Sequence, residues 1–436
     1  MSLLTINQCS ELAGEVTIPA DKSISHRALM FASLALGTSK ITNLLEGHDC
    51  LATLKLMQEL GIKIIKENNY WLVHGKGRAG LCEPQNILDC QNSGTTMRLM
   101  SGLLSAMNFF CVLDGTKQIK SRPMARVIEP LTLMGAHIYA RENNTKAPIA
   151  ILPSKLQAID FTLQQKSAQV KSALILASLF SGQKSRITNT KATRDHTERM
   201  LNFMGANIEV GDDHVTINPL THELKPLELS IVGDISSAAF LIVAGVLLAK
   251  DGILLKNVGV NHTRTGIIDA LIKMGADIKI INKSLVANED MADIFIKKSS
   301  LKAASFEGDE VARMIDEIPI LALAATQAMG VSIIKDALEL KVKESNRINK
   351  TVTELKKLGC TIEETFDGMI ITGQSSLKKI SVEHYGDHRL ALMLSIAGLL
   401  CQDGLQIKDW QVMDDSFPGF IHILTDLGAK VEKSIQ

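Results

Sequence analysis

Residues 21–27 hold the side chains best suited to binding an anion. They read Asp-Lys-Ser-Ile-Ser-His-Arg and directly precede an apolar run at 28–36. That run predicts a buried helix, for which Ser23 or Ser25 would be the N-cap. Because the first N–H groups of a helix carry partial positive charge, cations at this end are unfavourable without a compensating anion. The segment therefore predicts a phosphate or carboxylate site, with a solvated basic turn as the alternative.

Five further apolar runs begin with similar polar groups. They follow Asn-Ser-Gly-Thr-Thr-Met-Arg at 92–98, Ser-Ala-Gln-Val-Lys-Ser at 167–172, Gly-Asp-Ile-Ser-Ser at 233–237, Asp-Glu-Ile-Pro at 316–319 and Gly-Asp-His-Arg at 386–389. Glycine and hydroxyl residues let a ligand approach the backbone closely. If the runs are equivalent, their starts lie at one edge of each domain and face a common cleft. Asp316 could cap its helix or act as a general base, and the sequence leaves both open.

Loops elsewhere add cations, among them Arg122 and Arg194. In Lys-Glu-Ser-Asn-Arg at 343–347, the i, i+4 spacing would put Lys343 and Arg347 on one face of a helix. A surface network of ion pairs explains this segment equally well, so its residues alone do not decide between the two.

The elements that must position these residues repeat six times. A helical pattern ending in Leu-Gly or Met-Gly recurs, followed by a short alternating run that predicts a strand. Each glycine suits the left-handed position that ends a helix, and the six are Gly61, Gly135, Gly205, Gly275, Gly359 and Gly428. Each repeat thus holds a buried helix, an amphipathic helix and several strands.

A repeat of about 70 residues buries too little surface to fold alone, so we expect two groups of three. The predicted domains are 20–233 and 1–19 with 234–436. The last repeat is short, and we expect Glu15-Val16-Thr17-Ile18 to supply its missing strand. The chain would then pass twice between the two domains, and these two segments would form a hinge. A single six-unit solenoid is the alternative.

Composition limits the function classes. The 47 basic and 47 acidic side chains cancel, which gives no indication of a nucleic-acid or membrane partner. Seven scattered cysteines without metal-ligand spacing, and a start unlike a signal peptide, predict a cytoplasmic protein. The P-loop, dinucleotide, zinc-protease and serine-hydrolase motifs are missing from the sequence. We therefore expect chemistry without metal or other cofactor.

The ordered set of motifs closely resembles the 3-phosphoshikimate 1-carboxyvinyltransferase (EPSP synthase) family over essentially the whole chain. The matching motifs are Lys22-Ser23-x-Ser25-x-Arg27, Asn92-Ser93-Gly94-Thr95-Thr96-x-Arg98, Arg122-Pro123, Ser167-Ala168-Gln169, Asp316-Glu317-x-Pro319, Lys343-Glu344-x-x-Arg347 and Asp387-His388-Arg389. The resemblance implies an α/β fold of two domains, each of three βαβαββ units. It also implies transfer of the enolpyruvyl group of phosphoenolpyruvate to the 5-hydroxyl of shikimate 3-phosphate.

The resemblance assigns residues to both substrates. Those for shikimate 3-phosphate are Lys22, Ser23, Arg27, Ser167, Ala168, Gln169, Arg194, Asp316 and Lys343. Those for phosphoenolpyruvate are Lys22, Gly94, Arg122, Gln169, Arg347 and Arg389. Together the substrates bring a charge of roughly −5 to −6, which such cations would offset. The catalytic residues would be Asp316 as the base, Glu344 as the group that protonates the methylene carbon, and Lys22. A monomer acting on small molecules is expected.

Three positions bear on the details of the resemblance. Asn346 stands where the family usually has Asp, a change expected to be tolerated. Asp415 stands where many members have Lys, so an additional phosphoenolpyruvate cation is not expected there. Gly94 occupies the position that tunes glyphosate tolerance in relatives, and its lack of a side chain predicts competitive inhibition by glyphosate.

Two other functions are alternatives for this sequence. The related UDP-N-acetylglucosamine enolpyruvyl transferases typically have a cysteine in a mobile loop, and residues 114–120 contain none. A non-enzymatic repeat scaffold would bind polyanions generally and release no phosphate.

Overall fold

The computed structural model describes residues 2–435. Contacts divide the chain into unit 1, Met1–Pro19, Val232–Ser284 and Asp290–Gln436, and unit 2, Ala20–Ile231 and Leu285–Glu289. The bounds predicted from the sequence differ by two residues near 233 and by the short segment 285–289. That the units are the hinged domains of an enzyme stays a prediction.

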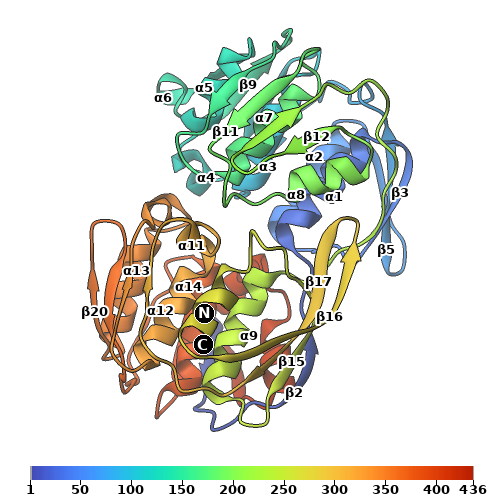
Figure 1. Cartoon of the computed structure of the whole chain (residues 1–436). Helices are drawn as coiled ribbons and strands as arrows, with labels where there is room; N and C mark the ends of the chain where they lie inside the picture. Colours follow the sequence, from blue (N-terminus) through green and yellow to red (C-terminus); the bar gives the residue numbers. More distant parts are fainter. Residues whose placement is uncertain (1, 436) are drawn as a thin grey trace. The chain divides into compact units, whose positions relative to one another are not determined.

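Unit 2 contains three modules, each built of helices and a small sheet (Figure 1). The first has α1 (Lys22–Leu34), β3 (Leu36–Thr42), α2 (His48–Glu59), β4 (Lys63–Lys66), β5 (Tyr70–Lys76) and β14 (Glu228–Ser230). The second has β6 (Leu88–Asp89), α3 (Gly94–Leu104), β7 (Cys111–Asp114), α4 (Lys117–Ser121), α5 (Ala125–Leu133), β8 (His137–Ala140), α6 (Arg141–Asn144) and β9 (Lys146–Leu152). The third has β10 (Asp160–Thr162), α7 (Ala168–Ser178), β11 (Ser185–Thr188), α8 (His196–Phe203), β12 (Ile208–Val210) and β13 (His214–Ile217).

The three sheets of unit 2 share one topology. Their strand orders are β14-β3-β5-β4, β6-β7-β9-β8 and β10-β11-β13-β12. The first two strands in each order are parallel, and the remaining pairs are antiparallel. A parallel pair needs a crossover connection. In the second and third modules the buried helix provides it, whereas β14 reaches the first module from the end of the unit.

The modules of unit 2 enclose a common core. Helix α3 contacts both α1 and α7, and α1 also contacts α8 of the third module. Since the first module touches the third, a linear solenoid is wrong for this unit.

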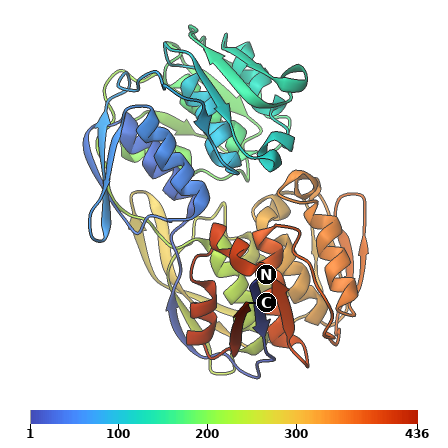
Figure 2. The same cartoon turned by 180° about the vertical axis from the view of Figure 1, so that it is seen from behind.

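Unit 1 repeats the plan (Figures 1 and 2). Its first module has β2 (Gly14–Thr17), α9 (Ile235–Leu248), β15 (Ile253–Gly259), α10 (Gly266–Lys273), β16 (Asp277–Val286) and β17 (Glu289–Lys297). The next has β18 (Ser305–Phe306), α11 (Gly308–Ala312), η1 (Ile315–Glu317), α12 (Ile318–Gln327), β19 (Val331–Ile334), η2 (Leu338–Val342), α13 (Arg347–Lys357), β20 (Thr361–Glu364) and β21 (Met369–Thr372). The last has α14 (His388–Leu400), β22 (Leu405–Lys408), η3 (Trp410–Asp415), α15 (Phe420–Asp426), β23 (Val431–Ile435) and β1 (Ser2–Ile6). Helices α9, α12 and α14 pack against one another at the centre.

The start of the chain completes two sheets of unit 1, which corrects one prediction. Glu15, Val16 and Thr17 lie in β2, which pairs in parallel with β15 and belongs to the first module of the unit. The short last repeat is completed instead by β1, which lies between β22 and β23. The strand β1 is the more apolar of the two, with Leu4 and Ile6 fully buried. It therefore fills the central position of its sheet.

The six repeat glycines confirm the predicted helix ends. All have positive φ, between 88° and 101°, directly after an amphipathic helix: Gly61, Gly135, Gly205, Gly275, Gly359 and Gly428. An L-residue with a side chain is strained in this region, which explains why glycine recurs here.

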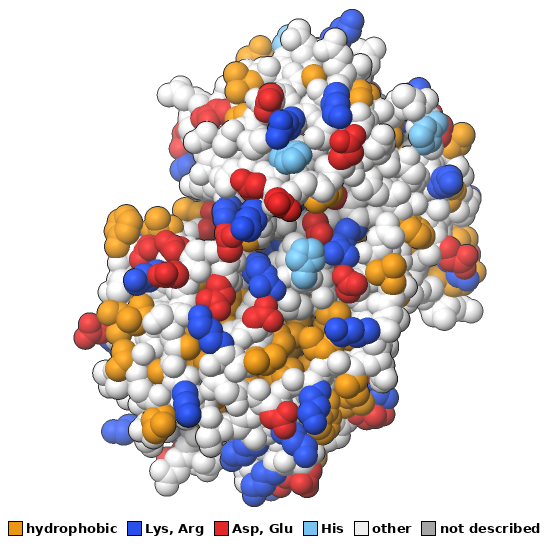
Figure 3. Space-filling view, viewed as in Figure 1, with side chains coloured by type: hydrophobic (Ala, Val, Ile, Leu, Met, Phe, Trp, Pro, Cys, Tyr) orange, Lys and Arg blue, Asp and Glu red, His pale blue; other side chains and the backbone are white. Residues whose placement is uncertain are grey.

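Surface and core agree with the composition. The helices predicted to be buried are buried; in α9 every residue but Leu247 is enclosed. Basic and acidic side chains are interspersed on the face drawn in Figure 3. Within residues 2–435, no helix is both long enough and apolar enough to cross a membrane.

Candidate active site

The first predicted site segment begins α1, and Asp21 caps this helix. Its Oδ1 accepts a hydrogen bond from the Ile24 N–H at 2.8 Å. The prediction of Ser23 or Ser25 as N-cap was wrong, because the helix begins one turn earlier and a carboxylate suits its positive end. Ser25 instead donates to the Asp21 carbonyl at 2.8 Å and accepts from the Leu45 N–H at 3.1 Å.

Arg27 is held inside unit 2 by three hydrogen bonds. Its Nε donates to Thr197 Oγ1 at 2.7 Å, Nη2 to Ser172 Oγ at 2.8 Å, and Nη1 to the Ser23 carbonyl at 3.0 Å. Burial lowers the pKa of Arg27 to about 10, although Glu198 and Asp21 favour its charge. The guanidinium is therefore cationic at neutral pH and held in one orientation.

The second and third helix starts of unit 2 bring two more arginines together. Arg98 Nη1 donates to Gln169 Oε1, and Gln169 Nε2 donates to Thr95 Oγ1 at 3.0 Å. A Cβ on Gly94 would lie 2.7 Å from Nη1 of Arg122 and 3.4 Å from Nη1 of Arg98. Both guanidinium groups thus lie at the start of α3, where glycine exposes backbone N–H groups to an anion.

The remaining predicted residues of unit 2 lie near these groups. Lys22 Nζ contacts Asp49 Oδ2 at 2.6 Å, and both side chains are about one-fifth exposed. Ser167 caps α7, and Ala168 is the first residue of that helix. Arg194 lies in the loop before α8, where its charge acts on Arg27.

A buried polar chain joins the first three helices of unit 2. Ser93 caps α3, and Thr96 Oγ1 donates to Ser93 Oγ at 2.7 Å. Thr96 also shares a 2.7 Å hydrogen bond with Thr53 on α2, and Thr53 shares another of 2.7 Å with His26 Nδ1 on α1. Burial lowers the pKa of His26 to about 3, so this histidine is neutral near pH 7. It supports the site and carries no charge to a ligand.

In unit 1, Arg347 lies among three carboxylates. Its Nε donates to Asp387 Oδ2 at 2.8 Å, Nη1 to Asp316 Oδ1 at 3.1 Å and Nη2 to Glu344 Oε2 at 2.6 Å. Burial disfavours both ionised forms, yet the contacts raise the pKa of Arg347 and lower that of Asp387. Lys343 Nζ lies 3.3 Å from the same oxygen of Asp316, so two cations stabilise its negative charge.

The predicted helical face for Lys343 and Arg347 was wrong. Helix α13 begins at Arg347, and Lys343 has extended backbone before it, at the end of η2. The two cations meet at Asp316 because the intervening loop turns, and helical periodicity plays no part. Asn346 caps α13 by accepting from the Asn349 N–H at 3.2 Å, a role that Asn and Asp perform equally.

A second buried network in unit 1 ends at Arg389, and sequence analysis did not find it. Arg264 Nη2 donates to Asp234 Oδ1 at 3.1 Å and to Ser236 Oγ at 2.6 Å. Ser236 donates to Glu317, whose Oε1 lies 3.6 Å from Arg389 Nη1. The sequence signal for this network was a polar residue at each of three apolar helix starts. Asp415 is the last residue of η3.

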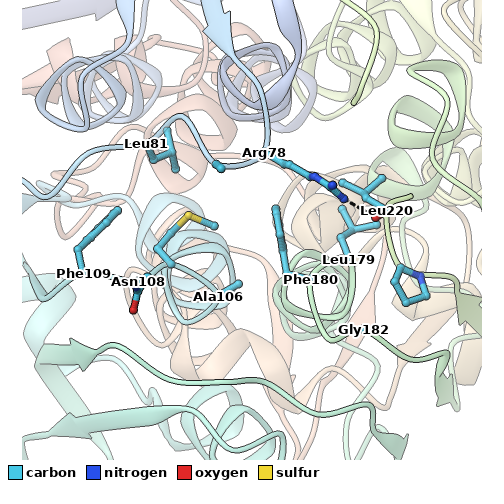
Figure 4. A pocket seen from close by; sticks show the side chains of 12 residues that line it. Arg78, Leu81, Ala106, Asn108, Phe109, Leu179, Phe180, Gly182 and Leu220 are labelled. Atoms are coloured by element: carbon cyan, nitrogen blue, oxygen red, sulfur yellow. Dashed lines mark hydrogen bonds between the residues drawn. The ribbon is translucent and has the colours of Figure 1, made fainter. Parts of the chain in front are cut away.

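A cavity in unit 2 lies away from these residues. About 480 Å³ in volume, it is lined by segments that follow the C-terminal ends of α3 and α7, including Met107, Phe109 and Phe180 (Figure 4). The predicted site residues lie at the opposite, N-terminal ends of the same helices, so this cavity is not the predicted substrate site.

Modules of this topology, with ionised groups at the starts of their buried helices, place the chain in the class of enolpyruvyl transferases. A sequence model described as EPSP synthase (3-phosphoshikimate 1-carboxyvinyltransferase) matches residues 6–424. The chain belongs to this family, as the sequence motifs predicted.

Individual relatives agree with the family assignment. The 3-phosphoshikimate 1-carboxyvinyltransferase of Citrifermentans bemidjiense is 44% identical over 97% of this chain and 99% of its own. That of Bacillus thuringiensis subsp. konkukian is 47% identical over 95% and 97%. The structure of EPSP synthase from Acinetobacter baumannii covers both chains completely at 36% identity, with a TM-score of 0.89.

The predicted fold class and enzyme class are therefore confirmed. The chain is a transferase of the shikimate pathway that moves the enolpyruvyl group of phosphoenolpyruvate to the 5-hydroxyl of shikimate 3-phosphate. These relatives are neither UDP-N-acetylglucosamine enolpyruvyl transferases nor binding scaffolds.

Proposed function

We propose that the residues at the helix starts hold the two substrates and carry out the proton transfers. The residues that bind shikimate 3-phosphate are Lys22, Ser23, Arg27, Ser167, Ala168, Gln169 and Arg194 of unit 2 and Asp316 and Lys343 of unit 1. The residues that bind phosphoenolpyruvate are Lys22, Gly94, Arg122 and Gln169 of unit 2 and Arg347 and Arg389 of unit 1.

One observation carries the substrate assignment: buried arginines gather at the helix starts of unit 2. Arg27, Arg98 and Arg122 are 3%, 4% and 8% exposed. A buried guanidinium attracts an anion more strongly than an exposed one, because water screens its charge less. Phosphate and carboxylate groups of the substrates supply such anions, and guanidinium groups bind them with paired N–H donors.

In the proposed mechanism, Asp316 removes the proton of the 5-hydroxyl as its oxygen attacks the enol carbon. Glu344 delivers a proton to the methylene carbon, which becomes a methyl group in a tetrahedral ketal. Glu344 then takes a methyl proton back as the carbon–oxygen bond to phosphate breaks. Lys22 and Arg347 stabilise the charge that develops on the phosphate and carboxylate oxygens.

Both carboxylates are paired with cations in unit 1: Asp316 with Lys343 and Arg347, and Glu344 with Arg347 at 2.6 Å. Pairing favours the ionised form that a base must have, which fits Asp316, whereas Glu344 has to bind a proton before it can donate one. Proton transfer through these groups needs no metal or other cofactor.

Phosphate-release kinetics with both substrates test the substrate assignment. Arg27→Ala is expected to raise the KM for shikimate 3-phosphate, and Arg122→Ala that for phosphoenolpyruvate, each by about 10- to 100-fold, as expected for a lost charged hydrogen bond. Equal increases of both KM values in both variants would refute the division of the substrates.

The same proposal includes a cytoplasmic monomer. The seven cysteines are scattered through the sequence without metal-ligand spacing, which is typical of proteins from a reducing compartment. Sedimentation of the purified chain measures the oligomeric state directly.

A further inference from the structure

A buried ion pair lies behind Arg27 in unit 2. Lys171 Nζ is 2.5 Å from Glu198 Oε1, and the two side chains are only 2% and 1% exposed. Among the residues that the structure describes, neither oxygen of Glu198 accepts a hydrogen bond of good geometry, so the carboxylate is compensated by the charge of Lys171. Burying two ions is costly, and an exposed or apolar pair would often be at least as stable. The stability of the fold alone therefore does not explain why an ion pair is buried at this position.

The pair adjoins the two hydroxyl groups that hold Arg27. Lys171 precedes Ser172 on α7, and Glu198 follows Thr197 on α8. Ser172 Oγ and Thr197 Oγ1 share a hydrogen bond of 2.7 Å and accept from Nη2 and Nε of Arg27. The ion pair and the hydroxyl pair thus join the same two helices side by side.

The carboxylate of Glu198 also interacts electrostatically with the guanidinium of Arg27. Glu198 is the carboxylate that most strongly favours the charged guanidinium, ahead of Asp21, while Arg194 opposes it. One buried carboxylate, Glu198, therefore acts on two buried cations, Lys171 and Arg27.

The three hydrogen bonds of Arg27 leave two of its five N–H groups for a ligand, one on Nη1 and one on Nη2. Their direction depends on Ser172 and Thr197, because these hydroxyls fix the opposite side of the guanidinium. Any sliding of α7 against α8 would turn the guanidinium away.

We propose that Lys171 and Glu198 are positioning residues for the binding of shikimate 3-phosphate, because their ion pair fixes α7 against α8 and thereby orients Arg27. The inference rests on the proposed function of Arg27. Neither residue touches the substrate, and neither acts on phosphoenolpyruvate.

The test uses a double variant that keeps the packing but removes both charges. Lys171→Met with Glu198→Met avoids leaving a single buried ion, so the fold is preserved. In the full-length enzyme the KM for shikimate 3-phosphate should rise about tenfold, while kcat and the KM for phosphoenolpyruvate stay within about twofold. Lys171→Arg keeps the ion pair and should restore nearly native kinetics. Glu223→Gln, at the exposed pair with Arg78 in the same unit, serves as a matched control without effect.

The outcomes separate this inference from the proposed function. If the Met/Met variant melts like the native enzyme and has native KM values while Arg27→Ala impairs shikimate 3-phosphate binding, the positioning role is refuted and the role of Arg27 stands. If Arg27→Ala has no effect on that KM, both are refuted. Equal losses for both substrates would show that the pair serves only folding, which also overturns the inference.

Discussion

Gly94→Ala should weaken phosphoenolpyruvate binding by displacing Arg122. The new Cβ would lie 2.7 Å from Arg122 Nη1, and ordinary contact begins near 3.4 Å. The guanidinium end must therefore retreat by roughly 0.7 Å or rotate, because the start of α3 is fixed by its cap. A shift of that size takes a charged hydrogen bond out of its optimal geometry.

The expected cost follows from that lost contact. A hydrogen bond to a charged group contributes about 1.5–3 kcal/mol, so the KM for phosphoenolpyruvate should rise about 10- to 100-fold. The KM for shikimate 3-phosphate is the internal control, since Arg27 lies on α1 and makes none of its hydrogen bonds to Gly94. Glyphosate inhibition should weaken in parallel if the inhibitor competes for the same arginine.

Phosphate release at saturating shikimate 3-phosphate and varied phosphoenolpyruvate provides the assay. A native KM in a variant of unchanged melting temperature would refute the role of Gly94 as the space that Arg122 needs. A raised KM for shikimate 3-phosphate alone would mean that the two substrates were assigned to the wrong arginines.

Two further predictions concern chemistry and pH. Asp316→Ala should lower kcat by about 10²- to 10⁴-fold, the usual contribution of a general base, and full turnover would remove Asp316 from that role. His26→Gln should make the stability of the enzyme less sensitive to acid. In the unfolded chain His26 has a pKa of about 6.5, whereas burial lowers its pKa in the folded protein to about 3. The unfolded state therefore binds a proton first, and the native protein loses stability as the pH falls between these two values. Denaturant unfolding at pH 7 and 4.5 should show about 2–3 kcal/mol of this loss in the native chain and less in the variant; an equal loss in both would contradict the explanation.

The fold could be predicted from the sequence where the local conformational preference of a residue matches its burial in the folded protein. The six glycines after amphipathic helices and the six apolar helices are direct consequences of backbone conformation and burial, so their periodicity appears in the sequence. The α1 cap was mispredicted because Asp, Ser and Thr all cap helices, and the choice depends on where the chain enters the helix. Glu15-Val16-Thr17 was assigned to the wrong sheet because alternation indicates a strand but not its partner.

The residue types of the candidate site could be predicted from the sequence, but the contacts between those residues could not. The cations at helix starts were visible because they violate a local preference. The partners of Arg27 were not, because Ser172 and Thr197 look like ordinary helix residues until α7 and α8 pack together. Lys171 and Glu198 carried no sign of being buried, since 27 residues separate them and long charged side chains usually reach solvent.

The central position of β1 has a consequence for synthesis of the protein. Ser2 pairs with Ile435, so β1 cannot find its neighbours until β22 and β23 have been made. Unit 2 receives its closing strand β14 soon after residue 230 and can finish folding during translation. Unit 1 must keep β1 unpaired until then, and loss of β1 would break two strand pairings of its sheet, whereas loss of β23 would break one.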